Sequence, residues 1–278
     1  MARYGMLINC NHCIGCYNCF LTCQDEFCGN TYEGYAVAAP MEGHNYMRVI
    51  DKERGRYPRV KVAYIPKTCM HCKNAKCIEA AENGAVYRRS DGIVVIDPVK
   101  AVGQKQIVDA CPYRVIEWNE KEKVPQKCNM CAHLLDKGEK QPRCVESCPT
   151  NAIVFGDLDD DSSEISQLLK LKSAEKLCPE FNLKEKVLYL GLPKRFISGT
   201  VVYQDKKECV NDLQVELQGE NETRTTRTNM FGDFEFEGLE ANQSFLLKIS
   251  QPGYKEENLP CNTTADIHTG EIYLIPKA

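Results

Sequence analysis

Residues 9–23, NCNHCIGCYNCFLTC, place five cysteines within fifteen positions. Four of them follow the spacing C-x2-C-x2-C-x3-C, at Cys13, Cys16, Cys19 and Cys23. In iron–sulfur proteins with this spacing, three thiolates bind one cluster and the fourth binds a neighbouring cluster. Three cysteines within seven residues are also too closely spaced for the paired ligands of most zinc sites. The run therefore predicts an iron–sulfur cluster, and a second cysteine run that shares its ligands.

Three further segments carry parts of the same pattern. Two of them end in the Cys-Pro pair that usually closes such a run, whereas Cys23 is followed by Gln24. A zinc site with four sulfur ligands is the alternative for the last segment, because its cysteines form two spaced pairs. The segments are Cys69-x2-Cys72-x4-Cys77, Cys111-Pro112, and Cys128-x2-Cys131-x12-Cys144-x3-Cys148-Pro149.

The missing members of these segments indicate how the segments pair. Ala81 stands where the second segment would carry its fourth cysteine. Ala101, Gln104 and Ile107 stand where the third would carry its first three. Pairing the first segment with the fourth and the second with the third collects all the empty positions in one lost site, whereas other pairings leave incomplete sites. We therefore expect three [4Fe-4S] clusters: cluster one on Cys13, Cys16, Cys19 and Cys148; cluster two on Cys23, Cys128, Cys131 and Cys144; cluster three on Cys69, Cys72, Cys77 and Cys111.

The other cysteines and the nearby histidines are assigned simpler roles. Fourteen of the seventeen cysteines precede residue 150, which argues against a disulfide scaffold spread over the chain. The five cysteines outside the clusters are expected to be small buried apolar side chains. The histidines beside cluster cysteines are expected to pack or hydrogen-bond, because cysteines already complete every site. These residues are Cys10, Cys28, Cys178, Cys209 and Cys261, and His12, His71 and His133.

The composition is that of a soluble globular protein. The chain has 278 residues, 43% of them hydrophobic and 27% charged, enough for one large or two ordinary domains. A formal net charge of −4 disfavours nucleic acid as a partner. The sequence has neither a run of about 18 apolar residues nor a recognisable export signal at its start. We expect no membrane span and a cytoplasmic location, unless a partner protein carries the chain out.

The pattern changes along the chain and predicts an α+β fold. Residues 1–160 form the predicted iron–sulfur domain, and residues 161–196 a connector that packs back on it, with a short helix that Ser162 or Ser163 caps. From residue 197 to 278 the period is two, which predicts a small antiparallel β-sandwich. Residues 48–61 hold six basic and two acidic residues, and we expect a solvated face there.

Several phrases resemble one protein family. DGIVVIDP, ACPYRVIEWNE, QKCNMCAHLLD and PRCVESCPTNAIVFGDLDD are similar to the iron–sulfur subunits of the DMSO-reductase family of molybdopterin enzymes. The resemblance implies two nested bicluster-ferredoxin-like modules, here with one cluster site lost, and a large catalytic partner subunit that holds molybdopterin with Mo or W. The C-terminal strands resemble carboxypeptidase-regulatory or transthyretin-like domains, which are usually structural.

The resemblance also implies an electron-transfer role, with no substrate-converting centre on this chain. The lost site and the β-rich C-terminal part resemble the branch of the family that transfers hydroxyl groups between polyhydroxylated aromatic compounds. Two alternatives remain open. One is a subunit that delivers electrons to a reductive dehydroxylase or another reductase of the family. The other is a free-standing ferredoxin-like carrier.

Overall fold

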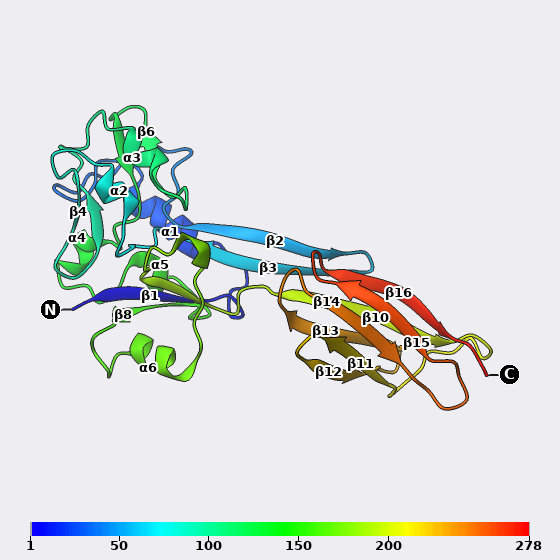
Figure 1. Cartoon of the computed structure of the whole chain (residues 1–278). Helices are drawn as coiled ribbons and strands as arrows, with labels where there is room; N and C mark the ends of the chain where they lie inside the picture. The colour runs from blue at the N-terminus through cyan, green and yellow to red at the C-terminus, as the bar shows by residue number, and fades with distance from the viewer. Residues whose placement is uncertain (1, 278) are drawn as a thin grey trace. The chain divides into compact units, whose positions relative to one another are not determined.

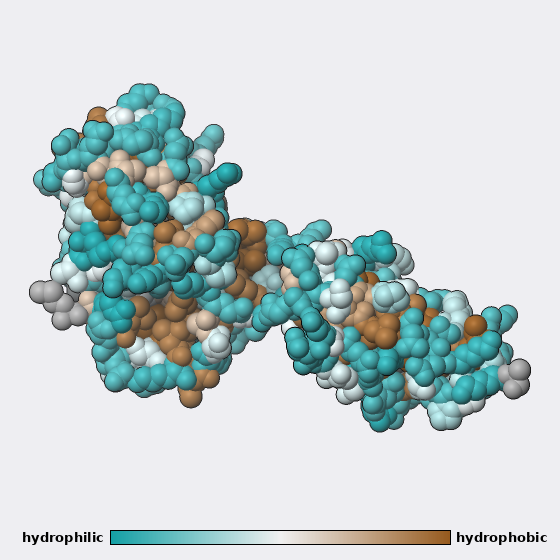
Figure 2. Space-filling view, viewed as in Figure 1, coloured by the Kyte–Doolittle hydropathy of each residue, from teal (hydrophilic) through white to brown (hydrophobic). Residues whose placement is uncertain are grey.

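The computed structural model describes residues 2–277 and divides them into two compact units (Figure 1). The first unit comprises residues up to 51 and 64–192, and the second comprises residues 52–63 and those from 193 onward. Short helices and small sheets make the fold α+β, as predicted. Hydrophilic residues cover most of the face in Figure 2, with hydrophobic residues in patches between them. Among residues 2–277, no helix is long and apolar enough to cross a membrane.

A three-stranded sheet forms the base of the first unit. Its order is β8–β1–β9, in which β1 (Tyr4–Asn9) runs antiparallel to β8 (Ile153–Asp157) and parallel to β9 (Val187–Leu190). Both faces of β1 are buried, because Met6 and Ile8 join the core that contains the cysteines, while Leu7 packs with Ile165 on the other face. The period of two thus places the cysteine loops and α6 on opposite sides of the sheet.

Helix α6 (Glu164–Leu171) begins as the sequence indicates. Ser163 is its N-cap, and the Ser163 hydroxyl accepts a hydrogen bond from Ser166 N at 3.3 Å. This bond satisfies one of the backbone donors that a helix leaves open in its first turn. Of the two predicted caps, Ser163 is therefore the correct one.

The remaining helices of the first unit are short, and all of them except η1 contain or adjoin predicted cluster ligands. Helix α1 includes Cys19 and Cys23, and α2, α4 and α5 lie at the other cysteine runs. Two small hairpins, β4–β5 and β6–β7, connect these runs. The bounds are α1 Asn18–Phe27, α2 Lys76–Glu79, α3 Gln106–Asp109, α4 Ala132–Leu135, α5 Arg143–Glu146, η1 Pro179–Phe181, β4 Val86–Arg88, β5 Val94–Ile96, β6 Glu117–Asn119 and β7 Val124–Gln126.

A longer hairpin of β2 (Arg48–Arg56) and β3 (Arg59–Lys67) contributes to both units. Its tip, residues 52–63, belongs to the second unit. There the Arg59 guanidinium pairs with Glu235 at 2.7 Å, and Lys61 pairs with both Glu235 and Glu237. Most residues of 48–61 are exposed, as predicted for a solvated face, and the acidic partners of Arg59 and Lys61 lie about 175 positions away in the sequence.

The second unit consists of two sheets around a shared core. Their orders are β13–β10–β16 and β12–β11–β14–β15, and the buried residues of both sheets form one hydrophobic cluster. All of these strand pairs are antiparallel except β10–β16, which is parallel. The prediction of antiparallel strands was wrong for this pair, because a period of two identifies a strand but not its partner's direction. The bounds are β10 Arg195–Tyr203, β11 Gln214–Gly219, β12 Thr223–Arg227, β13 Asp233–Leu239, β14 Ser244–Ile249, β15 Glu257–Asn262 and β16 Ile267–Leu274.

Candidate metal centres

The three C-x2-C segments share one backbone turn. In each segment the residue directly before the second cysteine has a positive φ, at Gly15 (68°), His71 (44°) and Met130 (54°). Such a left-handed residue is uncommon outside glycine, so its recurrence at one position marks a repeated local structure. At Gly15 the ring of Tyr64 occupies the space that a Cβ would need.

The two Cys-Pro segments also repeat one geometry. Arg114 and Asn151, each three residues beyond its cysteine, have φ values of 51° and 50°. Ala152 N donates a hydrogen bond to Cys148 Sγ at 3.2 Å. At the equivalent position after Cys111, the Val115 backbone also bonds the thiol and lowers its pKa, although burial has the larger effect and raises it. Backbone N–H groups directed at sulfur stabilise thiolates and tune bound clusters.

The thiols of the first run interact with Cys148. Burial, together with the nearby Cys13, Cys148 and Cys16, raises the pKa of Cys19 to about 12. Burial also raises the pKa of Cys13, as do Cys148 and Cys16. Cys148 is 129 positions beyond Cys19 in the sequence, so the fold brings the predicted ligands of cluster one together.

Cys23 lies with the cysteines of the fourth segment. Burial raises its pKa well above the usual value, and Cys128 and Cys131 add to the effect. Burial likewise raises the pKa of Cys144, and the nearby Cys131, Cys23 and Cys128 contribute smaller increases. All four of these side chains are buried, whereas Cys16 of the first run is exposed. The predicted ligands of cluster two are thus the most enclosed of the three sets.

The predicted ligands of cluster three line a common cavity. Cys69, Cys72, Cys77 and Cys111 all border it. Burial, together with the nearby Cys69, Glu185, Cys111 and Cys77, raises the pKa of Cys72 to about 12. The fold therefore gathers this set as well.

The donor chemistry of these sets fits iron–sulfur clusters. All twelve cysteines are free thiols in sets of four, and buried thiolates need a compensating positive centre. Within residues 2–277, no three His, Cys, Asp or Glu side chains are close enough together to hold a single metal ion. A four-iron cluster does not require such convergence, because each thiolate binds a different iron atom.

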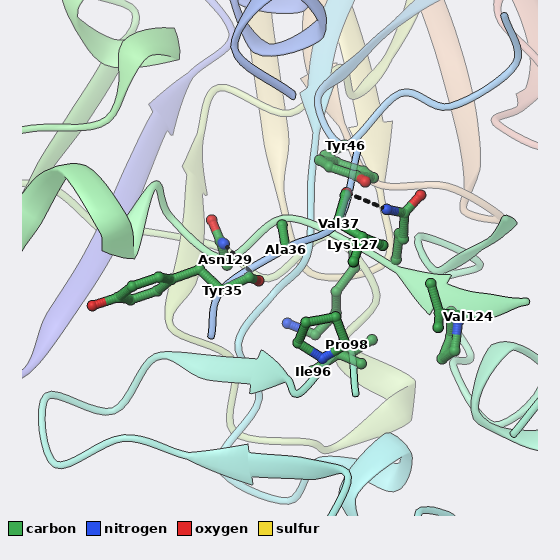
Figure 3. A pocket seen from close by; sticks show the side chains of 11 residues that line it. Tyr35, Ala36, Val37, Tyr46, Ile96, Pro98, Val124, Lys127 and Asn129 are labelled. Atoms are coloured by element: carbon green, nitrogen blue, oxygen red, sulfur yellow. Dashed lines mark hydrogen bonds between the residues drawn. The ribbon is translucent and has the colours of Figure 1, made fainter. Parts of the chain in front are cut away.

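Lys127 is a functional candidate that the sequence did not single out. Its side chain is only 6% exposed, and its ammonium donates hydrogen bonds to Cys128 O at 3.0 Å and to Val94 O. No carboxylate in the described part of the chain lies within 4 Å of it. It lines both the cavity of the cluster-three cysteines and the pocket of Figure 3, whose lining also includes Tyr35, Tyr46 and Asn129. A lysine directly before a cysteine carries no signal of burial, so only the fold identifies it.

The three histidines differ in their surroundings. His133 Nε2 hydrogen-bonds Glu26 Oε1 at 2.9 Å, and its ring stacks on Tyr32 with centroids 3.7 Å apart. His71 is buried, and its Nδ1 accepts a hydrogen bond from Val94 N at 3.0 Å. His12 is exposed. The contacts of His71 and His133 are those of packing and hydrogen-bonding residues, as predicted.

The positions of the lost site lie together and are filled. Ala81, Ala101 and Ile107 belong to one hydrophobic cluster, in which Ala101 and Ile107 are completely buried. The Gln104 side chain accepts a hydrogen bond from Glu82 N at 2.8 Å and donates to Lys100 O at 2.8 Å and to Glu82 O at 3.3 Å. Apolar packing and an amide therefore occupy the place where the sequence predicts that a cluster is missing.

The cysteines outside the predicted sites are not uniformly buried. Cys10 is buried, and Cys28, Cys178 and Cys261 are partly buried. Cys209 is exposed, so the prediction of a buried apolar role was wrong for it. It lies just before the buried Val210 in a short bridge to Val202, where alternation turns its side chain outward.

Comparisons with known proteins agree with the chemistry of the first unit. A family model described as a 4Fe-4S dicluster domain matches residues 60–158. The chain is 40% identical over 260 residues to the pyrogallol hydroxytransferase small subunit of Pelobacter acidigallici, covering 91% of this chain and 92% of that protein. It is 33% identical over 210 residues to a sulfite dehydrogenase subunit of Allochromatium vinosum, covering 70% and 85%. It is 35% identical over 198 residues to a tetrathionate reductase subunit of Salmonella typhimurium, covering 70% and 75%.

Sequence identity at this level over most of both chains indicates shared ancestry, because a common short motif would give a match over only a small part of each chain. The matched relatives are subunits of oxidoreductases and of a hydroxytransferase, and the matched family model describes a 4Fe-4S dicluster domain. The chain therefore belongs to the iron–sulfur electron-transfer subunits of the DMSO-reductase family of molybdopterin enzymes.

Proposed function

We propose that this chain binds three [4Fe-4S] clusters in two nested ferredoxin-like modules from which a fourth site has been lost. The mutual effects of the thiols on one another's pKa values support this pairing, as do the repeated turns. The association of Cys148 with Cys13 and Cys19 disfavours the alternative zinc site, which would need Cys148 beside Cys144. When bound, the clusters supply one-electron carriage. The proposed ligands are Cys13, Cys16, Cys19 and Cys148; Cys23, Cys128, Cys131 and Cys144; and Cys69, Cys72, Cys77 and Cys111.

The cluster proposal is tested by the Cys148→Ser variant. The wild type is expected to hold about twelve iron and twelve sulfide atoms, four of each for every cubane. The variant should lose the spectrum of the cluster on Cys13, Cys16 and Cys19, more than a hundred positions away. A matched Cys261→Ser variant should keep all three clusters, because Cys261 lies in the second unit. An iron content near sixteen, or loss of the Cys128–Cys144 cluster in Cys148→Ser, would contradict the pairing.

We further propose that the chain serves a transhydroxylase of polyhydroxylated aromatic compounds. The observation that carries this proposal is the extent of similarity to the hydroxytransferase small subunit. That match covers 91% of the chain and must include much of the second unit, whereas the two reductase- and dehydrogenase-type matches above cover 70%. Catalysis would take place on a large partner subunit with molybdopterin and Mo or W. Our chain would hold the clusters, and we propose a cytoplasmic location for the complex.

The lost site favours the same function on chemical grounds. A transhydroxylase moves a hydroxyl group between ring positions with no net oxidation, so it needs electrons only to prime the metal or transiently. A dehydroxylase consumes two electrons in each turnover and needs a continuous supply. A shortened chain of clusters, with Ile107 and Gln104 in place of ligands, is compatible with the smaller electron demand.

The test uses the purified complex of both subunits. The complex is reduced, excess reductant is removed, and a trihydroxybenzene is supplied without oxygen. We expect many turnovers to a redox-neutral product. Product that stops at the stored electron equivalents and resumes only with added donor would instead favour a reductive dehydroxylase. A monomer that never co-purifies with a large subunit would favour a free-standing carrier.

A further inference from the structure

The first unit contains an open cleft of about 770 Å³ with a strongly basic lining. Seven basic side chains and two acidic ones border it, a net charge of +5 on a chain whose formal net charge is −4. Because the chain as a whole is acidic, this concentration of positive charge is a local feature and not a property of the overall composition.

Three lysines of the cleft have no internal carboxylate partner. Both acidic residues of the cleft pair with other basic residues that line it, Asp159 with Arg3 at 2.5 Å and Glu185 with Lys176 at 3.3 Å. In the part of the chain that the structure describes, no carboxylate lies within 4 Å of the ammonium groups of Lys73, Lys184 and Lys186. Their positive charge is therefore available to an external anionic partner.

Residues that line this cleft are hydrogen-bonded to the cysteine loop of proposed cluster three, and Lys73 of that loop lines the cleft itself. Arg88 Nη2, which lines the cleft, donates hydrogen bonds to Cys72 O at 2.7 Å and to Lys73 O at 2.8 Å. Lys186 N donates to Met70 O at 3.0 Å, and Lys73 N donates to Lys184 O at 2.9 Å. The segment around Lys184 and Lys186 is thus fixed to the loop that carries Cys72. A molecule in the cleft would lie one backbone layer from a proposed ligand.

We propose that the cleft is the docking site of a small acidic one-electron carrier protein that exchanges electrons with cluster three. The inference rests on the proposed ligands Cys69, Cys72, Cys77 and Cys111. Since apolar side chains fill the fourth site, cluster three has no further cluster to exchange electrons with, and the electrons that prime the metal would enter it from an external carrier. In the exchange one electron leaves the reduced carrier and reduces the cluster, and no bond or proton moves. Encounters of this kind bury little surface and rely on charge steering.

The experiment uses the two-subunit complex and a strongly acidic plant-type ferredoxin as the probe. Lys73→Glu/Lys184→Glu reverses two exposed charges of the cleft. Lys121→Glu/Lys140→Glu makes the same change of net charge at exposed lysines outside the cleft. Two quantities are measured against ionic strength: the affinity for oxidised ferredoxin by interferometry, and the rate at which reduced ferredoxin is oxidised in stopped flow. Iron content and co-elution of the subunits are determined for every variant.

At low salt we expect the cleft variant to lower both the affinity and the rate by about tenfold or more, and the difference to vanish at high salt. The control should change both by less than about twofold. Equal effects of the two variants would overturn the proposal. So would loss of co-elution in the cleft variant, which would assign the cleft to the large subunit, or a cleft variant that binds ferredoxin as tightly as the wild type. An iron content that contradicts three clusters while the cleft effect persists would refute the cluster proposal alone.

Discussion

The side chain of Gln104 is expected to stabilise the first unit from within the lost cluster site. It is 8% exposed and makes hydrogen bonds at 2.8 Å to Glu82 N and to Lys100 O. In Gln104→Ala both backbone groups lose their partners, and each loss costs about 1 kcal/mol or more. We therefore expect a total destabilisation of about 2–3 kcal/mol. For a unit of this size, that corresponds to a melting temperature lower by about 4–12 °C.

The assay is differential scanning calorimetry of the cluster-loaded protein at a fixed heating rate. Gln106→Ala is the matched control, because Gln106 lies two positions away in the exposed first turn of α3. It should change stability by less than about 0.5 kcal/mol. Iron content should be the same in both variants, since neither residue is a proposed ligand. A melting temperature for Gln104→Ala equal to that of Gln106→Ala would refute the view that the amide stabilises the filled site.

Four other expectations follow from the contacts described. Burial by itself would raise the pKa of Glu26, but hydrogen bonds from Tyr32, His133 and Arg143 outweigh the effect of burial and lower this pKa. The Glu26 carboxylate therefore stabilises the fold at neutral pH, and this stabilisation is lost as the pH falls through the lowered pKa. Glu26→Gln should therefore lower the melting temperature at pH 7, with a gap that narrows below about pH 4. Lys127→Met should lower the reduction potentials of clusters two and three in an EPR-monitored titration, because a buried positive charge favours the reduced state. The control is Lys123→Met at an exposed lysine, and equal potentials in the two variants would argue against this role of Lys127. Ile14, 62% exposed beside Cys13, should contact the large subunit, so Ile14→Asp should reduce co-purification while Val99→Asp, 79% exposed elsewhere, should not. A variant that lacks residues 193–278 and has a two-residue turn in place of residues 52–63 should keep its iron content. Loss of a cluster spectrum in this variant, if it is soluble, would contradict the assignment of all clusters to the first unit.

The cysteine spacing predicts the candidate sites because ligand geometry constrains sequence directly. Gly15, His71 and Met130 adopt the same turn although their side chains have nothing in common. The turn is therefore recognisable in the sequence only from the two residues that separate its cysteines, and not from the identity of those residues. Counting forward from Cys77 and back from Cys111 also identified the four positions that the fold brings together in the filled site.

Features that depend on long-range contacts left no comparable signal. Lys127 reads as an ordinary polar residue, and its burial results from the packing of segments far apart in the sequence. The basic residues of the hairpin tip have acidic partners at Glu235 and Glu237, which no local pattern connects to them. The parallel pairing of β10 with β16 joins the two ends of the second unit. Each of these features depends on contact between two segments, whereas the periodicity of hydrophobic residues describes one segment at a time.

The division of the hairpin between the units has a consequence for the order of synthesis on the ribosome. Residues 52–63 leave the ribosome before residues 64–192, yet they belong to a unit whose other strands begin after residue 193. At about 5–20 residues per second, roughly ten seconds separate the two pieces. During that interval the first unit can complete its chain while Arg59 and Lys61 have no acidic partner. The second unit is thus completed last around a peptide that was made early, so a nascent chain that stalls near residue 192 would display an unpaired basic hairpin tip.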